Sequence, residues 1–555
     1  MEYDYIVVGG GSGGATLAGR LAERCPDASI ALIEAGPHTE RNWLVNTPLG
    51  IAALVPYKLG TNYGYETAPQ PGLAGRCGYQ PRGRGMGGSS AINAMIYTRG
   101  HPLDYDEWAQ QLGCAGWSWA DVLPYFRRAE GNTRGENAWH GASGPLTVSD
   151  LRYRNPLSVR FVAAAIEAGY RANDDFNGAE QEGVGFYQVT QRDGRRCSVA
   201  RAYLYDRPGS NGAARGNLHL MTDAIALRVV FDAQARANGV EIVRAGKIET
   251  LRARAEVVLA AGAFCSPQLL MRSGVGPALT LRTFGIPVVY DSPEVGANLA
   301  DHIDFTLNVR VPSSESVGYS LRGFAKMAAH LGAFMGRGEG LWSSNVAEAG
   351  GFIKSDPSLD RPDLQMHFCA ALVDDHSRRP HWGHGYSVHV CVLRPKSRGE
   401  VTLVSDDVRV PPRIDPRFLS DPRDAELLLK GVKIAQRIVA APPLAARGGR
   451  TLHVPPNASD AGLAELIAQH ADTIYHPVGT CRMGSDANAV VDTELRVRGV
   501  DRLRVVDASV MPALIGGNTN APTVMIGERA ADFIVASRRA AQAAPGDSLT
   551  MPERV

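Results

Sequence analysis

The stretch 3–34 constrains the fold more than any other part of the sequence, because its pattern predicts a strand, a glycine-rich turn, a helix and a second strand. Apolar runs at 6–8 and 30–33 are typical of short strands that are buried on both faces of a parallel sheet. Between them, leucines spaced four residues apart indicate a helix over 13–24. A parallel sheet covered by helices is therefore the expected core.

The turn between the first strand and the helix predicts a dinucleotide site. Its glycines, Gly9, Gly11 and Gly14, have the spacing Gly-x-Gly-x-x-Gly, which allows a tight turn, close approach to a diphosphate, and packing of helix on strand. The helix N-terminus at Ser12 offers free N–H groups to the phosphates. Glu34 is placed to accept hydrogen bonds from the ribose hydroxyls of an adenosine. The motif alone does not separate FAD from NAD.

Length and composition exclude several classes of protein. With 555 residues the chain is too long for one ordinary core, and its net charge of +1 gives no electrostatic case for binding nucleic acid. Its eight cysteines show neither a Cys-x-x-Cys pair nor metal-ligand spacing, which indicates reduced thiols. The first strand begins too close to Met1 for a signal peptide, and no apolar run reaches the ~18 residues of a membrane span. We therefore expect a cytoplasmic protein.

A second loop rich in glycine and serine occupies residues 81–100, and it suits a backbone laid against a cofactor. A flexible linker is the alternative on composition alone. The loop resembles the first signature of the glucose–methanol–choline (GMC) oxidoreductases, which are FAD enzymes that oxidise alcohols. The resemblance rests on residues 83–93 and on Tyr97, Gly100 and Asp106, with Met86 as a conservative departure. Some members bind FAD covalently through a His where this chain has Ile92, so non-covalent FAD is expected.

Two further segments resemble the same family. Residues 262–276 match its second signature at every defined position and follow a predicted buried strand at 257–262. We expect a helix that starts at Ser266 with Pro267 in its first turn. Residues 295–302 resemble the family's loop beside the flavin. Three matches in the right order, together with the dinucleotide motif, extend the resemblance over nearly the whole chain.

The resemblance implies a two-domain α/β (α+β) architecture, in which a Rossmann-like FAD-binding domain joins a substrate domain with an antiparallel sheet flanked by helices. Alternating runs at 364–368, 387–393 and 400–403 predict that antiparallel sheet, and helices are predicted over 323–336 and 421–440. The expected domains are FAD-binding at 1–155, 216–305 and 471–540, substrate at 156–215 and 306–470, and a disordered tail at 541–555.

Two features of the second domain allow more than one interpretation. The predicted helix 324–336 gathers apolar side chains near one face, which usually means core packing, although a lid or a helix that contacts membrane is the alternative. His381, His384 and His389 fit no standard metal spacing, so we predict no metal site.

Oxidation of an alcohol needs a base for the hydroxyl proton while hydride leaves the carbon, and histidine suits this role. His476 stands where the resembling family carries its active-site histidine, which implies a base or alkoxide stabiliser. Counting back from residues 525–529, which match the family's last helix, assigns the facing hydrogen-bond partner to Asn518, with Asn520 the choice if the count is two residues off.

The resemblance also implies the residues that contact FAD. Asp507 ends a predicted buried strand that starts at residue 503, and is expected near the diphosphate and ribityl chain. The complete set of predicted cofactor-binding residues is Gly9, Gly11, Ser12, Gly14, Glu34, Ala35, Arg84, Gly87, Gly88, Ser89, Asn93, Ala94, Met95, Ala261, Asp507, Ala508, Asn520, Pro522 and Thr523.

Within the family, residues 99–101, 345–352 and 395–399 are similar to bacterial choline-dehydrogenase-like enzymes. That likeness implies oxidation of primary aliphatic alcohols, with electrons passed to a quinone or an artificial acceptor. Choline is less favoured, because it requires an aromatic cage or a carboxylate that the sequence does not reveal. An oxidase that uses oxygen, a hydroxynitrile lyase on the same fold and an NAD-dependent dehydrogenase are the alternatives, and the glycine loop at 87–90 argues against the last. Peripheral contact with the inner membrane is left open.

Overall fold

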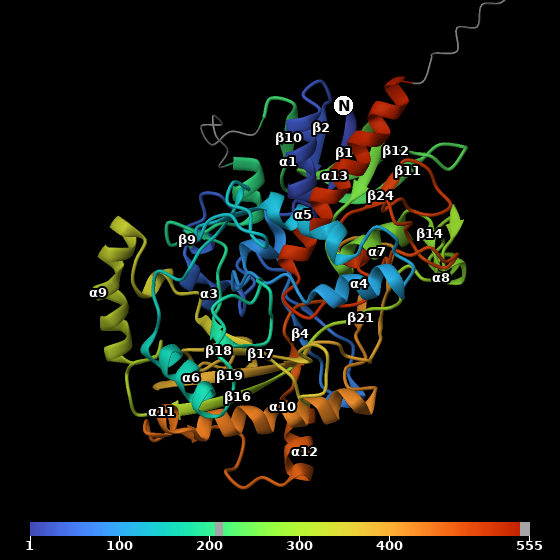
Figure 1. The fold of residues 1–555 in the computed structure, drawn as a ribbon. Coiled ribbons are helices and arrows are strands. Elements are labelled where there is room, and N and C mark those ends of the chain that lie inside the picture. Colours follow the sequence, from blue (N-terminus) through green and yellow to red (C-terminus); the bar gives the residue numbers. More distant parts are fainter. Residues whose placement is uncertain (206–214, 544–555) are drawn as a thin grey trace, which may run out of the picture.

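The computed structural model describes residues 1–205 and 215–543 (Figure 1). Two sheets organise them. One sheet lies with helices α1 and α13 in the upper half of Figure 1, and the other lies with α6 and α10 in the lower half. The two hydrophobic cores around these sheets match the predicted pairing of a parallel and an antiparallel unit.

The first sheet has the order β10-β2-β1-β13-β12-β11, with β24 beside β13. The strands β10, β2, β1, β13 and β24 run parallel, whereas β11 and β12 extend the sheet as an antiparallel hairpin. The central strands are short: β2 is wholly apolar and buried, and β1 is buried from Tyr5 to Val8, as expected for strands inside a parallel sheet. The bounds are β1 Glu2–Val8, β2 Ile30–Ile33, β10 Leu218–Met221, β11 Ala224–Phe231, β12 Ala237–Arg244, β13 Lys247–Leu259 and β24 Leu503–Val505.

Three helices begin at the carboxyl ends of these strands: α1 Ser12–Arg24, α7 Gly262–Arg272 and α13 Asn520–Ala543. The prediction that the second helix starts at Ser266 is wrong, because α7 begins four residues earlier and contains Pro267. Ser266 bonds instead to the carboxylate of Asp507. The carbonyl of Ala263, which Pro267 cannot satisfy, accepts a hydrogen bond of 2.6 Å from the Thr480 hydroxyl.

The second sheet has the order β22-β16-β19-β18-β17-β7, with β23 beside β16, and all its pairs are antiparallel. The predicted runs at 364–368 and 387–393 lie in β18 and β19. The run at 400–403 does not join this sheet, because Gly399 pairs with Leu299 and directs the segment into a separate hairpin. The bounds are β7 Gly183–Phe186, β16 Ile303–Val311, β17 Ala347–Ile353, β18 Leu364–Cys369, β19 His384–Val392, β20 Glu400–Thr402, β21 Arg413–Asp415, β22 Arg450–Thr451 and β23 Asp472–Thr473.

Helices α6 and α10 cover the second sheet, and the other helices lie around the two cores (Figure 1). The predicted helix 421–440 is α10. Helix α13 continues to Ala543, so the predicted start of the tail at 541 falls inside a helix, and residues 544–555 lie outside the described part. The remaining α-helices of the described residues are α2 Trp43–Asn46, α3 Ile51–Leu54, α4 Pro102–Gln110, α5 Trp119–Ala129, α6 Pro156–Glu167, α8 Ala278–Thr283, α9 Leu321–Arg337, α10 Pro422–Ala440, α11 Pro442–Ala445 and α12 Asp460–His470.

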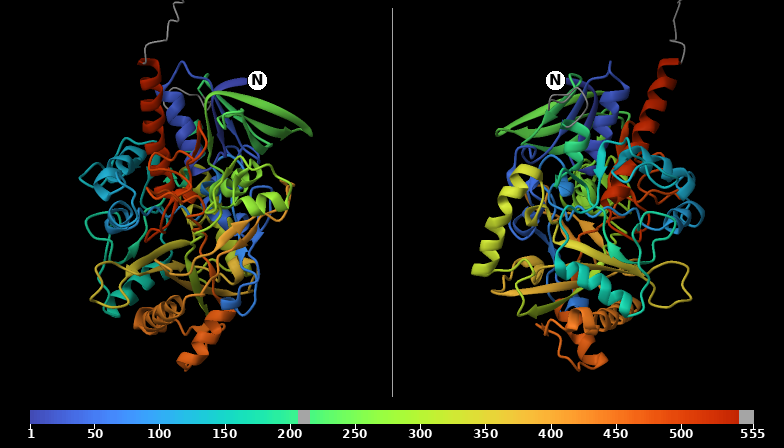
Figure 2. Two further views of the ribbon diagram at one scale, coloured as in Figure 1. Left: turned by 90° about the vertical axis from the view of Figure 1, so that its right-hand side faces the viewer. Right: turned by 60° about the vertical axis from the view of Figure 1, so that its left-hand side comes forward.

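Helix α9 stands at the edge of the molecule (Figure 2). Core packing, expected from its apolar residues, is wrong for most of the helix, because only Gly323 and Phe334 are buried. Among the helices in residues 1–205 and 215–543, none is long and apolar enough to cross a membrane.

Candidate active site

A cavity of about 930 Å³ lies between the two sheets and is lined by residues from both. Every predicted site residue lines it except Gly14, Gly87 and Pro522. Gly14 lies behind the cavity wall, where it allows helix α1 to pack closely on the first turn: a Cβ there would overlap the Gly9 carbonyl oxygen. Gly87 turns the second glycine loop with φ +98° and donates its N–H to the Gly10 carbonyl at 2.7 Å. These glycines shape the wall of the cavity and do not form its surface.

At one end of the cavity three helix N-termini converge, at Ser12 of α1, Gly262 of α7 and Asn520 of α13. The Ser12 hydroxyl donates to Asn520 Oδ1 at 2.7 Å, which joins two of them. Unpaired N–H groups and helix dipoles make such a convergence favourable for an anion such as a diphosphate. A Cβ added at Gly262 would meet no atom within 4 Å, and one at Gly11 none closer than 3.9 Å. The backbone is therefore open to a ligand at this end.

Glu34 lies in the cavity wall. Besides its predicted role of binding a ribose, it has a structural role that its position at a strand end did not predict. Its Oε2 accepts the N–H of Gly10, and its Oε1 accepts those of Gly36 and Gly85, each at 2.9 Å. The carboxylate thus ties the two glycine loops together. Because a carboxylate offers about four acceptor positions, roughly one remains for a ribose hydroxyl.

Asp507 lies two residues after strand β24 and fixes the start of α7. Its Oδ2 accepts the Gly262 N–H at 2.8 Å and the Ser266 hydroxyl at 2.5 Å, while its Oδ1 accepts the Ser509 N–H. Like Glu34, it is buried and lines the cavity. Both acidic residues therefore combine a place in the cavity wall with a structural role.

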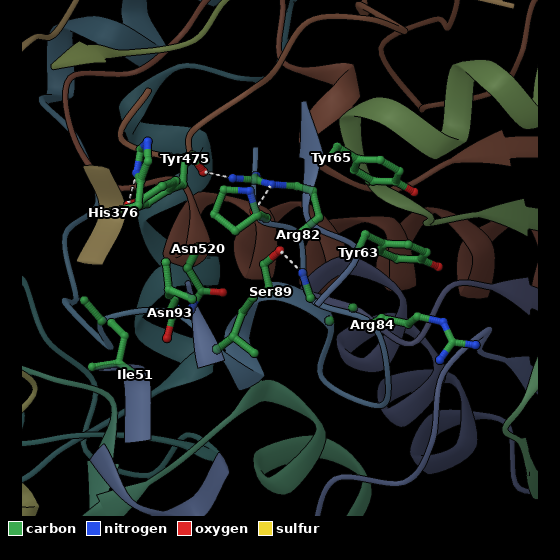
Figure 3. A pocket seen from close by; sticks show the side chains of 18 of the residues that line it. Ile51, Tyr63, Tyr65, Arg82, Arg84, Ser89, Asn93, His376, Tyr475 and Asn520 are labelled. Atoms are coloured by element: carbon green, nitrogen blue, oxygen red, sulfur yellow. Dashed lines mark hydrogen bonds between the residues drawn. The ribbon is translucent and has the colours of Figure 1, made fainter. Parts of the chain in front are cut away.

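Arg82 lies near the middle of the cavity wall and donates to the Tyr475 carbonyl at 2.9 Å. Figure 3 shows Tyr63, Tyr65 and Arg84 on one side of Arg82, and Tyr475 with His376 on the other. The two tyrosine rings on the first side stack with a centroid distance of 5.0 Å. The cavity thus has two ends of different character.

His476 and Asn518 both line the cavity and contact each other. Asn518 Nδ2 lies 3.1 Å from His476 Nε2. The Asn518 Oδ1 accepts hydrogen bonds from Thr98 Oγ1 at 3.2 Å and Gln365 Nε2 at 3.1 Å, which assigns the orientation of the amide. The amide nitrogen therefore donates to His476 Nε2, and that ring nitrogen must be unprotonated.

His302, which sequence reasoning missed as an active-site residue, supports the same tautomer from the other side. Its Nε2 is 2.9 Å from the Leu393 carbonyl, which can only accept, so that nitrogen carries a proton. Burial lowers the pKa of His302 to about 4, so its Nδ1 is a free acceptor at neutral pH. His476 Nδ1, 2.9 Å away, must then be the donor. The lone pair on His476 Nε2 is left on the Asn518 side.

The surroundings keep His476 neutral. Burial, followed by the nearby His302 and His367, holds its pKa well below the usual value. Its backbone N–H donates to Asp301 Oδ1 at 2.8 Å, and burial raises the pKa of that carboxyl to about 6. Asp301 and His302 belong to the predicted flavin-side loop 295–302, so a sequence signal for them existed.

Two further histidines line the cavity from neighbouring strands. His367 on β18 and His389 on β19 stand opposite each other in the strand register. Burial lowers the pKa of His367 to about 3. Burial alone would lower the pKa of His389 also, but Asp304, 2.7 Å from its Nδ1, raises it to about 10. No local motif marks either residue, because only strand pairing brings them to the site.

The histidines that lacked metal spacing have other partners. His381 Nε2 lies 2.7 Å from Asp374, and His384 contacts the hydroxyls of Ser316 and Ser320. No group of three or more histidine, cysteine or acidic side chains in the described part of the chain is arranged to hold a metal.

Beyond His476 the cavity wall is mainly apolar, although His367 and His389 also line it. Glu34 and Asp507, both at the glycine-rich end, are the only carboxylates among the described residues that line the cavity. The apolar lining includes Leu49, Ile51, Val55, Ile96, Val317, Phe324, Met327, Trp342, Val346, Leu372 and Val373.

Comparisons with known proteins agree with this geometry. Models of the GMC oxidoreductase family match residues 3–304 and 395–527. An alcohol dehydrogenase [acceptor] of Pseudomonas putida is 46% identical over 537 residues, covering 96% of each chain. Human mitochondrial choline dehydrogenase is 42% identical over 550 residues, covering 96% of this chain and 90% of that one.

Among solved structures, a mutant of the Aspergillus oryzae RIB40 formate oxidase, studied for its FAD modification, superposes with a TM-score of 0.89. It is 26% identical and the match covers 97% of this chain and 99% of the other. The resemblance found in the glycine loops is thereby confirmed, and this chain belongs to the GMC oxidoreductase family.

Proposed function

We propose that this FAD-dependent oxidoreductase oxidises primary, apolar alcohols to aldehydes, with His476 as the base. The observation that carries the proposal is the unprotonated His476 Nε2 beside the Asn518 amide, at the junction of a glycine-rich and an apolar cavity end. The Pseudomonas putida relative, named as an alcohol dehydrogenase [acceptor], supports the reaction class.

The glycine-rich end suits FAD. The open backbone at Gly11 and Gly262 and the three helix N-termini would hold its diphosphate, and Glu34 its adenosine ribose. Residues 87–93 would lie toward the flavin. Binding is non-covalent in this proposal, because the alkyl side chain of Ile92 cannot form the bond that a histidine makes. When bound, FAD supplies the acceptor for the hydride that leaves the alcohol carbon.

Side chains of the protein bind the alcohol oxygen and accept its hydroxyl proton. The alcohol oxygen would replace the direct contact between Asn518 and His476: its hydroxyl donates to His476 Nε2, and the Asn518 amide N–H then donates to the alcohol oxygen and holds it in place. As Nε2 takes the proton, positive charge spreads over the imidazole. The Nδ1–H bond to His302, itself anchored on the Leu393 carbonyl, steadies the ring during this change. His476, His302 and Leu393 are all buried.

The apolar end supports an alcohol with an alkyl chain. A quaternary ammonium is bound by a carboxylate, by an aromatic cage or by both; Phe324 and Trp342 line this end, but no lining residue near His476 in the described part supplies a carboxylate. Asp304 is paired with His389, whose pKa is raised, so this carboxylate is already neutralised, and burial raises the pKa of Asp301 to about 6. We therefore infer that choline is a poor substrate.

The proposed electron acceptor is a quinone, for which an artificial dye can substitute, and the proposed location is the cytoplasm. An oxidase that passes electrons to oxygen is the second candidate, because the formate oxidase shares the whole fold. The same base and cavity would serve a dehydrogenase and an oxidase. Only the rates at which quinone and oxygen reoxidise the reduced flavin distinguish these two functions.

The test is anaerobic reduction of the bound flavin by primary alcohols of increasing length, with choline as the comparison. Bleaching by the longer alcohols, followed by faster reoxidation with a soluble quinone than with oxygen, is expected. Absence of bleaching by any alcohol would overturn the proposal. Faster reoxidation by oxygen would replace the dehydrogenase with the oxidase.

A further inference from the structure

Helix α9 carries its apolar face outward. At 100° per residue, Leu321, Phe324, Leu331 and Met335 fall on one face together with the small residues Ala325, Ala328 and Gly332, and every one of them is exposed. Leu321 is 80% exposed, Met335 54%, Phe324 47% and Leu331 38%. A helix that packs only on its own protein normally shows the reverse arrangement.

The face of α9 that meets the protein carries the buried Phe334 and the half-buried Met327 together with the polar side chains of Lys326 and His330. Lys326 donates to the Glu315 carbonyl at 2.8 Å, and His330 Nδ1 accepts the Leu341 N–H at 3.3 Å. The side chain of Trp342 donates to the Met327 carbonyl. These bonds fix the rotation of the helix about its axis, so the outward apolar face is a set feature of the fold.

The exposed face continues into the rim of the active-site cavity. Phe324 lines the cavity and also lies near Tyr319 and Trp382, with ring centroids 6.5 Å and 6.4 Å away. Tyr319 and Tyr57 line the same opening. Trp382 is 64% exposed, and Tyr57 and Tyr319 are nearly half exposed. The outward face of α9 and this aromatic rim, Tyr57, Tyr319 and Trp382, are hereafter the rim surface.

Two exposed cations adjoin the rim surface. The chain from residue 316 to 338 has two arginines and one lysine and no acidic residue, although Glu315 and Glu339 flank it and Arg337 pairs with Glu339. Arg322 and Lys58, which follow Leu321 and Tyr57, are exposed and form no ion pair within the described part of the chain. Large apolar side chains, aromatic rings and flanking cations together are the composition of a helix that lies in a lipid interface.

We propose that the rim surface docks on an anionic lipid bilayer, with α9 parallel to the membrane plane. The mouth of the apolar cavity end then faces the bilayer, from which long-chain alcohols and a lipid-soluble quinone enter. This second part rests on the proposed function, whereas the docking itself follows from α9 and the rim alone. A second copy of the chain is the competing occupant of the same face.

The test is co-sedimentation of the FAD-loaded protein with vesicles of phosphatidylcholine, with or without phosphatidylglycerol. We expect binding to the mixed vesicles that weakens as salt rises. The triple variant Leu321→Ser, Leu331→Ser, Met335→Ser should bind at least about tenfold more weakly, because the lost apolar area no longer enters the interface. None of these three residues lines the cavity.

A matched control replaces exposed apolar residues elsewhere, Ile248→Ser, Leu279→Ser and Val404→Ser; Leu279 is 80% exposed, as Leu321 is. It should bind vesicles like the wild type. FAD content and melting temperature of both variants verify folding. The docking proposal is overturned if the wild type binds neither vesicle, or if the rim variant binds as well as the control. It is also overturned if the rim variant only converts a dimer to a monomer, which would assign the face to a second copy.

Entry from the bilayer has its own readout. The rim variant should reduce a water-soluble dye at the wild-type rate but a vesicle-embedded long-chain quinone more slowly. Equal loss with both acceptors would contradict entry through the rim. Vesicle binding needs no substrate, so its failure would leave the proposed reaction untouched.

Discussion

The two ends of the cavity are built by different means. The glycine-rich end consists of backbone: tight turns, helix N-termini, and two carboxylates that bind the loops to one another. The end beyond His476 consists of side chains from β18, β19, α9 and several loops. Backbone cradles suit a ligand that never changes, whereas a side-chain wall can be altered residue by residue to select substrates. The comparison predicts that mutations at the glycine-rich end reduce FAD binding, whereas mutations at the apolar end change substrate selection.

His476 sits at the junction, and its removal should have the largest effect. His476→Ala should lower turnover roughly 10²–10⁴-fold, the range for loss of an acid–base group, while FAD content stays at the wild-type level. Steady-state rates with a dye acceptor and the flavin absorbance measure the two quantities. His219→Ala, at an exposed position on β10, is the control. Near wild-type turnover in His476→Ala would remove the base from this site.

The glycine-rich end should fail in cofactor binding. A valine at Gly11 meets no protein atom closer than 3.9 Å from its Cβ, so the fold should survive, but the side chain would project into the cavity. We expect Gly11→Val to lose FAD with little change in the melting temperature of the apoprotein. Full FAD occupancy in this variant would show that the cofactor does not approach the first glycine loop.

Substitution of His302 tests a smaller effect, because His302 is a positioning residue that orients the His476 ring. His302→Leu removes the acceptor for His476 Nδ1 and should lower kcat about 10- to 100-fold with little change in KM, which corresponds to about 1–3 kcal/mol for an unmade buried hydrogen bond. His302→Asn restores an acceptor and should recover part of the rate. If both variants behave alike, the ring fills space and does not set the tautomer.

The apolar end should grade substrates by length. Each added methylene of a primary alcohol should raise kcat/KM by about fourfold until the cavity is filled, since burial of one CH₂ contributes about 0.8 kcal/mol. Choline should lie far below the trend. A flat response to chain length, or efficient oxidation of choline, would contradict an apolar wall that selects the substrate.

The smallest expected effect is on the pH dependence of stability, and it arises from a buried hydrogen-bond network next to Thr98. His140 contacts Glu130 and Asp175, and Glu130 pairs with Arg99, which follows the Thr98 that orients Asn518. Burial would lower the pKa of His140, but the hydrogen bonds to Asp175 and Glu130 raise it to about 9. Its contribution to stability is therefore complete below about pH 6.5 and is lost as pH rises through 9. His140→Gln should abolish that part of the pH dependence in denaturant unfolding.

At the glycine-rich end the sequence signals are local. A strand, three glycines and an acid within 34 residues specify one turn, and Glu34 follows at a fixed distance. The start of α7 was misplaced, since Asp507 and Thr480, more than 200 residues away, decide what Ser266 and Pro267 do. Long-range partners of this kind leave no trace in a local motif.

The side-chain end was predictable only where a family resemblance pointed to it. His476 and Asn518 came from that resemblance, whereas His367 and His389 depend on strand register and carry no motif. The sequence also did not predict that the apolar face of α9 points outward. Periodicity reveals that a helix has an apolar face but not whether that face meets the core or the surface.

The central claim is that His476 is neutral, with a lone pair on Nε2 available to the substrate. Nitrogen NMR of the FAD-loaded enzyme with labelled histidine, assigned by comparison with His476→Ala, tests it most directly. The account predicts a neutral ring at pH 7 with the proton on Nδ1, and a change of that signal in His302→Leu. A ring protonated on Nε2, or on both nitrogens, would contradict it.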